Sequence, residues 1–282
     1  MTAQPRLLVT GAAGLLAPYV ADAATGFDLF STARRGGDHV ADLSNSGDVE
    51  RLLRDVRPDA VIHTAGFTDV DGCENDPPRA FRDNAVTARL IAELLPPASH
   101  LVLVSTDQVY ADRGGPHSEL ETVPANEYGR SKLAGEWGAC AAHAKTGVIR
   151  TNLFGPSRTQ GRNSLSDFMI EQFSKKREFT LFDDVLFSPL HMATLATLLI
   201  EFVRKGIVGV FNAGSREGMT KAAFGLRIAE LKKLDASKAR IGTSLQTPGR
   251  APRPRDLRLD VGKLERTLGR AMPTLEQELR LI

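Results

Sequence analysis

Short apolar runs alternate with segments of helical periodicity along the first half of the chain. Apolar runs rich in strand-forming residues predict buried strands, and apolar residues spaced three or four positions apart predict helices. The predicted strands are residues 6–10, 27–31, 60–63, 100–105 and 148–150. The predicted helices are residues 15–24, 48–56 (with Ser46 and Asp48 as candidate caps), 78–95, and one that contains Tyr128 and Lys132. Strands that alternate in this way with helices indicate a parallel sheet with right-handed crossovers.

The pattern changes after residue 150, where strands become sparser and connections longer. We therefore expect an α/β fold in which residues 1–150 form a Rossmann-type doubly wound parallel sheet. Residues 151–282 are expected to form mainly a smaller α/β lobe. Within that lobe the apolar helix 192–203 and the strand 209–212 are expected to return to the first domain, as parts of a segment spanning about 189–213.

Composition and charge narrow the class of protein. The 282 residues are 42% hydrophobic and 25% charged, which is ordinary for a globular protein. A net charge of +2 is too small for a protein that tracks a phosphate backbone, so no nucleic-acid partner is expected. No apolar run is long enough to span a membrane, and the first five residues are too short for a signal peptide. The two cysteines lack metal-type spacing, so we expect reduced thiols, no metal site and a cytoplasmic location.

A glycine-containing loop follows the first strand directly, with the sequence Gly11-Ala12-Ala13-Gly14-Leu15-Leu16-Ala17. Gly11 permits a sharp turn, and Gly14 lets the backbone approach a pyrophosphate closely. The start of the following helix would offer free N–H groups to the same anion. The loop predicts a dinucleotide site whose contacts come from Gly11, Ala13, Gly14, Leu15 and Leu16, although its glycine spacing is three and three rather than the usual two and three.

The end of the second strand carries Arg34 and Arg35 where many NAD enzymes carry an acidic residue. Two arginines suit a 2′-phosphate, and the missing carboxylate removes a repulsive charge. The sequence thus favours NADPH, with NADH as the open alternative and a solvated turn as the other explanation of the arginines. Asp42, which Leu43 follows, would bind the adenine or cap a turn.

Small residues follow the strand 60–63, with the sequence Thr64-Ala65-Gly66. They would let the backbone pass beside the adenosine, so all three are expected to contact the cofactor. None of the six histidines lies in a ligand-spaced pair, and all six, including His63, are interpreted as structural or surface residues.

Tyr128 and Lys132 lie four residues apart, which places a phenol and an ammonium on one face of a helix. A nearby cation favours the phenolate form of tyrosine, so Lys132 would lower the pKa of Tyr128. Thr106, at the end of the strand 100–105, would supply a second hydrogen bond to a reacting oxygen. These three residues are the predicted catalytic group, and chance spacing is the alternative.

Together the glycine loop, the Thr106 segment and the Tyr128–Lys132 pair resemble the extended short-chain dehydrogenase/reductase family. Within that family the likeness is nearest to the dTDP-4-dehydrorhamnose reductase subfamily. The narrower likeness rests on residues 58–66, 68–71, 73–74, 84, 105–110 and 128–136, and in the second half on Asp183-Asp184, Ser188-Pro189, Arg253-Pro254 and Leu259-Asp260.

The resemblance implies NADPH-dependent reduction of a nucleotide-linked 4-keto sugar. Tyr128 would then be the general acid, Lys132 would hold the nicotinamide ribose, and Thr106 would bond the same oxygen as Tyr128. The cofactor is also expected to contact Asn84 and Ser105. The substrate is expected to contact Thr68, Val70, Asn152 and Arg253. Arg253 would face the substrate diphosphate, unless it is an ordinary surface arginine.

Two departures from the subfamily concern the sugar pocket. The segment Thr151-Asn152-Leu153-Phe154-Gly155 lacks a tryptophan that the rhamnose-forming enzymes tend to have there, and Asp256 replaces an amide. Trp137, on the helix with Tyr128, is expected to pack against the sheet. The hydride chemistry is therefore better supported than the particular sugar.

Three questions stay open at this level. An epimerase or dehydratase that recycles bound NAD would share the fold. A non-catalytic NADP-binding regulatory protein, resembling the regulatory subunit of methionine adenosyltransferase, would share it too. A homodimer is compatible with the resemblance.

Overall fold

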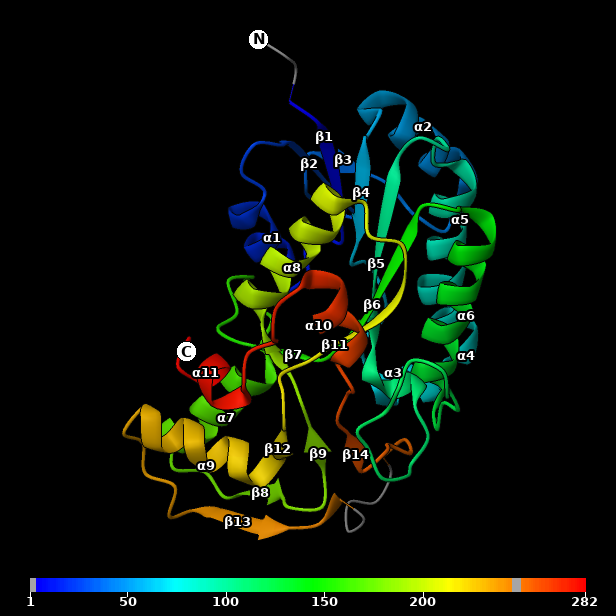
Figure 1. Ribbon diagram of the computed structural model, residues 1–282. Coiled ribbons are helices and arrows are strands. Elements are labelled where there is room, and N and C mark those ends of the chain that lie inside the picture. Colours follow the sequence, from blue (N-terminus) through cyan, green and yellow to red (C-terminus); the bar gives the residue numbers. More distant parts are fainter. Residues whose placement is uncertain (1–3, 245–249) are drawn as a thin grey trace.

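The computed structural model describes residues 4–244 and 250–282, and its centre is a parallel sheet (Figure 1). Seven strands form this sheet within the described residues, and each neighbouring pair is parallel. In order across the sheet they are β11 (Gly209–Ala213), β6 (Thr146–Thr151), β5 (His100–Thr106), β4 (Ala60–His63), β1 (Arg6–Thr10), β2 (Asp28–Ala33) and β3 (His39–Val40). The predicted α/β fold class is confirmed.

Helices cover both faces of the sheet, as its apolar strands require. Figure 1 shows α1 (Ala17–Ala23), α8 (Met192–Lys205) and α10 (Gly262–Leu268) over one face, and α2 (Ser46–Val56), α5 (Thr87–Leu94) and α6 (Glu127–Ala142) over the other. Alternate residues of each strand feed the two cores: Leu7 and Val9 of β1 pack beneath α1 and α8, whereas Leu8 packs beneath α2 and α5.

Two of the covering elements come from late in the chain. Helix α8 packs against α1, and β11 pairs with β6 at the edge of the sheet, with Phe211 opposite Ile149. Both run slightly beyond the predicted ranges. Gly206, at φ +60°, ends α8 in the left-handed conformation that glycine adopts readily.

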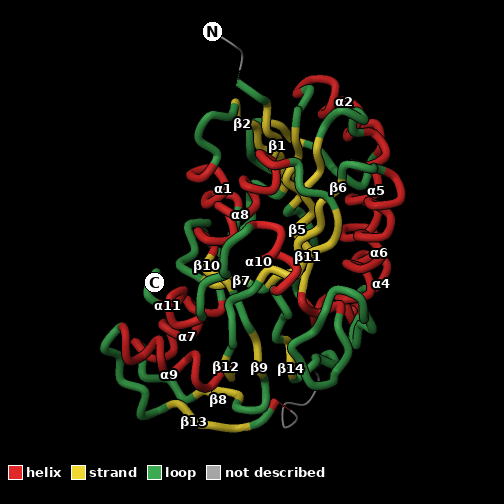
Figure 2. Tube along the Cα trace, in the orientation of Figure 1, coloured by secondary structure: helices red, strands yellow, loops and turns green. Residues whose placement is uncertain are grey.

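A smaller group of elements lies below the sheet, at the carboxyl ends of its strands (Figure 2). It has its own aromatic core, in which Phe154, Phe187 and Phe224 pack edge to face. Its helices are α7 (Leu165–Ser174), α9 (Lys221–Leu231) and α11 (Leu275–Leu279). Its strands are β7 (Leu153–Phe154), β8 (Phe179–Phe182), β9 (Leu186–Phe187), β10 (Leu190–His191), β12 (Met219–Thr220), β13 (Ala239–Gly242) and β14 (Asp256–Leu257).

The helix predicted for residues 78–95 is present, but a π-helical turn interrupts it. The structure has α4 (Pro77–Phe81), a π-helical turn η1 (Arg82–Val86) and then α5, preceded by the short helix α3 (Val70–Asn75). A π turn holds one more residue than an α turn, and such turns often occur at functional sites. This one lies beside the cavity described below.

Three further predictions about the helices need correction. Helix α1 begins at Ala17, not Leu15, because the chain from Gly11 to Leu16 turns instead. The cap of α2 is Asn45, whose side chain accepts from the Asp48 N–H, and neither Ser46 nor Asp48 is the cap. Trp137 is 65% exposed because Tyr128, Lys132 and other residues of α6 fill the inward face of that helix.

Among the described residues, no helix is both long and apolar enough to cross a bilayer.

Candidate active site and cofactor cavity

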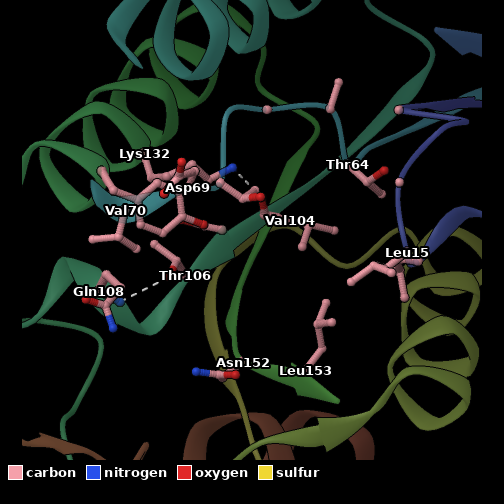
Figure 3. A pocket seen from close by; sticks show the side chains of 18 of the residues that line it. Leu15, Thr64, Asp69, Val70, Val104, Thr106, Gln108, Lys132, Asn152 and Leu153 are labelled. Carbon is pink, nitrogen blue, oxygen red and sulfur yellow. Dashed lines mark hydrogen bonds between the residues drawn. The ribbon is translucent and has the colours of Figure 1, made fainter. Parts of the chain in front are cut away.

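A cavity of about 1000 Å³ lies between the carboxyl ends of the strands and the smaller lobe. Its wall includes the glycine loop, the ends of β2, β5 and β6, and residues of α6, α9 and β14. Ligands of open parallel sheets bind at this edge, where loops from successive strands converge. Figure 3 shows Leu15, Thr64, Thr106 and Asn152 around the same space.

The glycine loop presents unpaired backbone donors to the cavity. Gly11 has φ +78°, and a Cβ there would lie 2.8 Å from the Thr64 Oγ1. Gly14 donates its N–H to the Gly11 carbonyl at 2.8 Å. Within the described part of the chain, no acceptor is found for the N–H groups of Ala13, Leu15 and Leu16. Free N–H groups in a loop that lines the cavity suit the phosphates of a dinucleotide.

The part of the cavity wall where β2 ends is basic and lies beside the glycine loop, because the Gly11 and Ala12 N–H groups donate to the Thr32 carbonyl. Arg34 and Arg35 both line it, and Arg34 Nη2 contacts the buried Asp83 carboxylate at 3.3 Å. Asp42 and Leu43 line this part too. The Asp42 carboxylate accepts from the Ser44 N–H at 3.0 Å, so it caps a turn, and this bond holds the pKa of Asp42 below its usual value.

The loop Thr64-Ala65-Gly66 forms another part of the cavity wall. Thr64 donates to the Thr10 carbonyl at 2.6 Å, which fixes the loop on the glycine turn. The structure does not place Asn84 on the cavity wall. Its amide is buried and bonds the Phe67 N–H and carbonyl and the Ser131 hydroxyl, so it supports the loop from behind.

Tyr128 lies in the first turn of α6, whose cap Asn126 accepts from the Gly129 N–H at 2.8 Å. The phenol is buried, and burial raises the pKa of Tyr128 above its usual value, while a hydrogen bond with Thr106 acts against this rise. Thr106 ends β5, and its Oγ1 accepts from the Gln108 N–H at 3.1 Å. The phenol and the hydroxyl therefore face the same point of the cavity.

Lys132 lies one turn further along α6 and is also buried. Its Nζ donates to the Val104 carbonyl at 2.7 Å, as Figure 3 shows. Burial lowers the pKa of Lys132 to about 8, and the Glu136 carboxylate partly opposes this shift. In this arrangement the pKa of Tyr128 is raised, not lowered as the sequence had suggested. Ser105, beside Thr106, lines the cavity but donates its hydroxyl to Glu136.

The substrate side of the cavity faces the smaller lobe. Thr68, Val70, Asn152 and Arg253 all line it, as do three charged residues that the sequence reasoning did not select: Asp107, Lys221 and Arg250. Asn152 donates to Asp107 at 2.7 Å, and Arg253 forms two hydrogen bonds with Asp71. Asp107 follows Thr106 directly in the sequence, and this position could have identified it as a cavity residue. Lys221 lies 89 residues beyond Lys132, so no local pattern predicts that it lines the same cavity.

Asp256 forms an ion pair with Arg258 at 2.7 Å. This is the residue that stands where the subfamily often has an amide. It also accepts from the Gly115 N–H at 2.8 Å, so it serves to hold a loop.

Comparison with known proteins assigns the chain to a family. The sequence profile of the RmlD substrate-binding domain family matches residues 5–282. The chain is 30% identical to the probable low-salt glycan biosynthesis reductase Agl14 of Haloferax volcanii, over 86% of this chain and 82% of that protein. It is 32% identical to a dTDP-4-dehydrorhamnose reductase of Mycobacterium tuberculosis, over 88% of this chain and 82% of the relative.

The fold agrees with these sequence matches. A crystal structure of the Bacillus anthracis dTDP-4-dehydrorhamnose reductase in complex with NADP superposes with a TM-score of 0.90 at 25% identity, over 98% of this chain and 97% of that one. The chain is therefore an oxidoreductase that belongs to the RmlD substrate-binding domain family, within the extended short-chain dehydrogenases/reductases.

Proposed function

We propose that this protein uses NADPH to reduce a nucleotide-linked 4-keto sugar. The observation that carries the proposal is that Thr106, Tyr128 and Lys132 line the same cavity as the glycine loop and the arginines that follow β2. The names of the relatives support a sugar-nucleotide substrate.

NADPH, when bound, would supply a hydride to the carbonyl carbon. Tyr128 then donates its phenolic proton to the carbonyl oxygen, and the Thr106 hydroxyl holds that oxygen beside the phenol. The raised pKa of Tyr128 keeps the phenol protonated at neutral pH, which suits a general acid. Lys132, held by its hydrogen bond to the Val104 carbonyl, adds a positive charge to the same cavity wall.

A cluster of cations would receive the diphosphate of the substrate. Lys221, Arg250 and Arg253 line the same side of the cavity. Burial and the charges of Arg250 and Arg253 lower the pKa of Lys221 to about 8, although Asp107 acts in the other direction. Like charges held this close favour an anion between them, and a diphosphate supplies one.

A panel of nucleotide-linked 4-keto sugars tests the proposal. We expect the purified protein to oxidise NADPH with at least one dTDP-linked 4-keto-6-deoxy sugar, and to use NADH less well. Folded protein that binds NADPH yet reduces no member of a panel covering dTDP, UDP and GDP sugars would contradict it.

We expect the pH profile of kcat/KM to fall on the alkaline side with a pKa of about 8. The group responsible is Lys132, whose charge is lost as the pH rises through that value, whereas Tyr128 titrates higher. A profile of kcat/KM from pH 6 to 10 reports this group in the free enzyme.

Two variants assign that alkaline limb. Lys132→Arg keeps a charge at all these pH values, so the limb should move upward even if the rate is lower. Lys221, which would bind the substrate diphosphate, has a similarly lowered pKa. Lys221→Gln should therefore lower kcat/KM at every pH but leave the alkaline limb of Lys132 in place. A limb that disappears in Lys221→Gln and persists in Lys132→Arg would contradict the assignment.

A further inference from the structure

Three arginines surround a single buried carboxylate, that of Asp83, in the π turn η1. Asp83 is 5% exposed. Arg34 reaches its Oδ2 at 3.3 Å, Arg79 reaches the same oxygen at 3.5 Å, and Arg82 reaches Oδ1 at 3.1 Å. The carboxylate thus ties the end of β2 to the segment between α4 and α5.

Only part of this cluster faces the cavity. Arg34, Arg79 and Asp83 belong to the cavity wall, together with Arg35, whereas Arg82 is not among the wall residues that the structure describes. Arg79 is held on a second side because its guanidinium lies over the Phe67 ring, 4.0 Å from the centroid.

The π turn holds Asp83 in this place. The Thr87 hydroxyl donates to the Asp83 carbonyl at 2.8 Å, and Asn84, the next residue, is locked against Phe67 and Ser131. The carboxylate is therefore fixed, while the arginines around it are about half exposed. Long exposed side chains lose rotamer freedom when they bind a ligand, and a fixed partner reduces that cost.

We propose that Asp83 is a positioning residue that selects the 2′-phosphate of NADPH by holding Arg34 and Arg79 at the cavity wall. The proposal rests on the NADPH preference proposed above. Three cavity-wall arginines, Arg34, Arg35 and Arg79, against the carboxylates of Asp83 and Asp42 leave this part of the cavity positive. A guanidinium bound to one oxyanion keeps further N–H groups for a second.

If Asp83 acted directly on the cofactor, its carboxylate would have the opposite effect on NADPH binding. A carboxylate near the ribose usually repels a 2′-phosphate and accepts hydrogen bonds from the ribose hydroxyls, which favours NADH. Replacing Asp83 with asparagine would then tighten NADPH binding. Under the positioning role the same replacement weakens it, so the sign of the change decides.

The experiment measures the Kd of NADPH and of NADH by cofactor fluorescence, without substrate. We expect Asp83→Asn to weaken NADPH binding about fivefold, the factor that corresponds to ~1 kcal/mol for an exposed ion pair. NADH binding should stay within about twofold of the wild type, because NADH lacks the phosphate. Tighter NADPH binding, or an equal loss for both cofactors, would overturn the proposal.

Matched variants keep the test decisive. Arg34→Gln should weaken NADPH about tenfold or more, and Asp83→Asn should add little in that background. Arg82→Gln breaks an ion pair with the same carboxylate away from the cavity and should change neither Kd. Asp83→Glu keeps the negative charge and should retain most of the preference for NADPH over NADH, so it tests the charge even if the asparagine variant fails to fold. Equal changes in the Kd of NADPH for Arg34→Gln and Arg82→Gln would count against the proposal. These binding measurements contain no substrate, so they test the selectivity for NADPH independently of whether the protein reduces a keto sugar.

Discussion

Tyr128→Phe should lower kcat/KM for the keto-sugar substrate by about 100- to 10,000-fold, the usual range for loss of a general acid. The substitution removes one oxygen and keeps the ring, which packs beside Cys73 and Ala80. The fold and the glycine loop should therefore be unaffected. Steady-state kinetics with NADPH, together with the Kd of NADPH, separate the loss of chemistry from any loss of binding.

The control for this variant is its unfolding midpoint and its NADPH affinity, both of which should match the wild type. Thr106→Val should give a smaller loss, because it removes a supporting hydrogen bond but leaves the proton donor. If Tyr128→Phe kept more than about a third of wild-type kcat/KM, the phenol would not be the acid.

Glu136→Gln should lower the free energy of unfolding by about 3–5 kcal/mol. Glu136 and Arg150 form an ion pair with a 2.7 Å contact, and their side chains are 1% and 4% exposed. The amide would leave the Arg150 charge buried without its counter-ion. It would also disturb the Ser105 hydroxyl, which donates to Glu136 beside the catalytic strand end. Urea denaturation measures the change.

An exposed ion pair serves as the comparison. Arg89 and Glu93 lie at 2.9 Å on α5 with 51% and 40% of their side chains exposed. Glu93→Gln should cost less than about 1 kcal/mol, because water screens the charges. Similar losses for both variants would show that burial does not set the strength of the Glu136–Arg150 pair.

The sheet was predictable because its signals are local. Buried parallel strands such as His100–Thr106 are continuous apolar runs, and their alternation with helices implies the crossover topology. The carboxyl ends of such strands meet at one edge of the sheet, and Gly11, Thr64 and Thr106 each lie at or just beyond such an end. The structure places all three on one cavity wall.

The π turn was not predictable, because one extra residue does not disturb an apolar pattern enough to be noticed. It turns the following side chains by about 100° relative to a regular helix. Asn84 was assigned to the cofactor from the family resemblance. In the structure its amide bonds Phe67 and Ser131, and the neighbouring Asp83 lines the cavity. Which of two neighbouring helical residues faces the cavity can be decided only from the backbone conformation.

Long-range charges were also beyond sequence reasoning. Lys221 and Asp107 are far apart in the chain but both line the cavity. Burial lowers the pKa of Lys221 and raises the pKa of Asp107, and the charge of each residue opposes the shift of the other. The ammonium of Lys132 was expected to act on Tyr128, but it is bonded to a main-chain carbonyl that no side-chain pattern reveals. Trp137 was placed inside because aromatic residues are usually buried, and a helix with an inward face already filled has no room for it.

Transfer of deuterium from cofactor to sugar tests the central claim most directly. The protein is incubated with NADPH deuterated at C4 of the dihydronicotinamide, using each label stereoisomer in turn, and with a dTDP-linked 4-keto-6-deoxy sugar. We predict a product one mass unit heavier with one of the two labels, with the deuterium at C4 of the sugar and one NADPH oxidised per product. A product formed without deuterium and without net loss of NADPH would contradict reduction and indicate an enzyme that recycles its own bound cofactor.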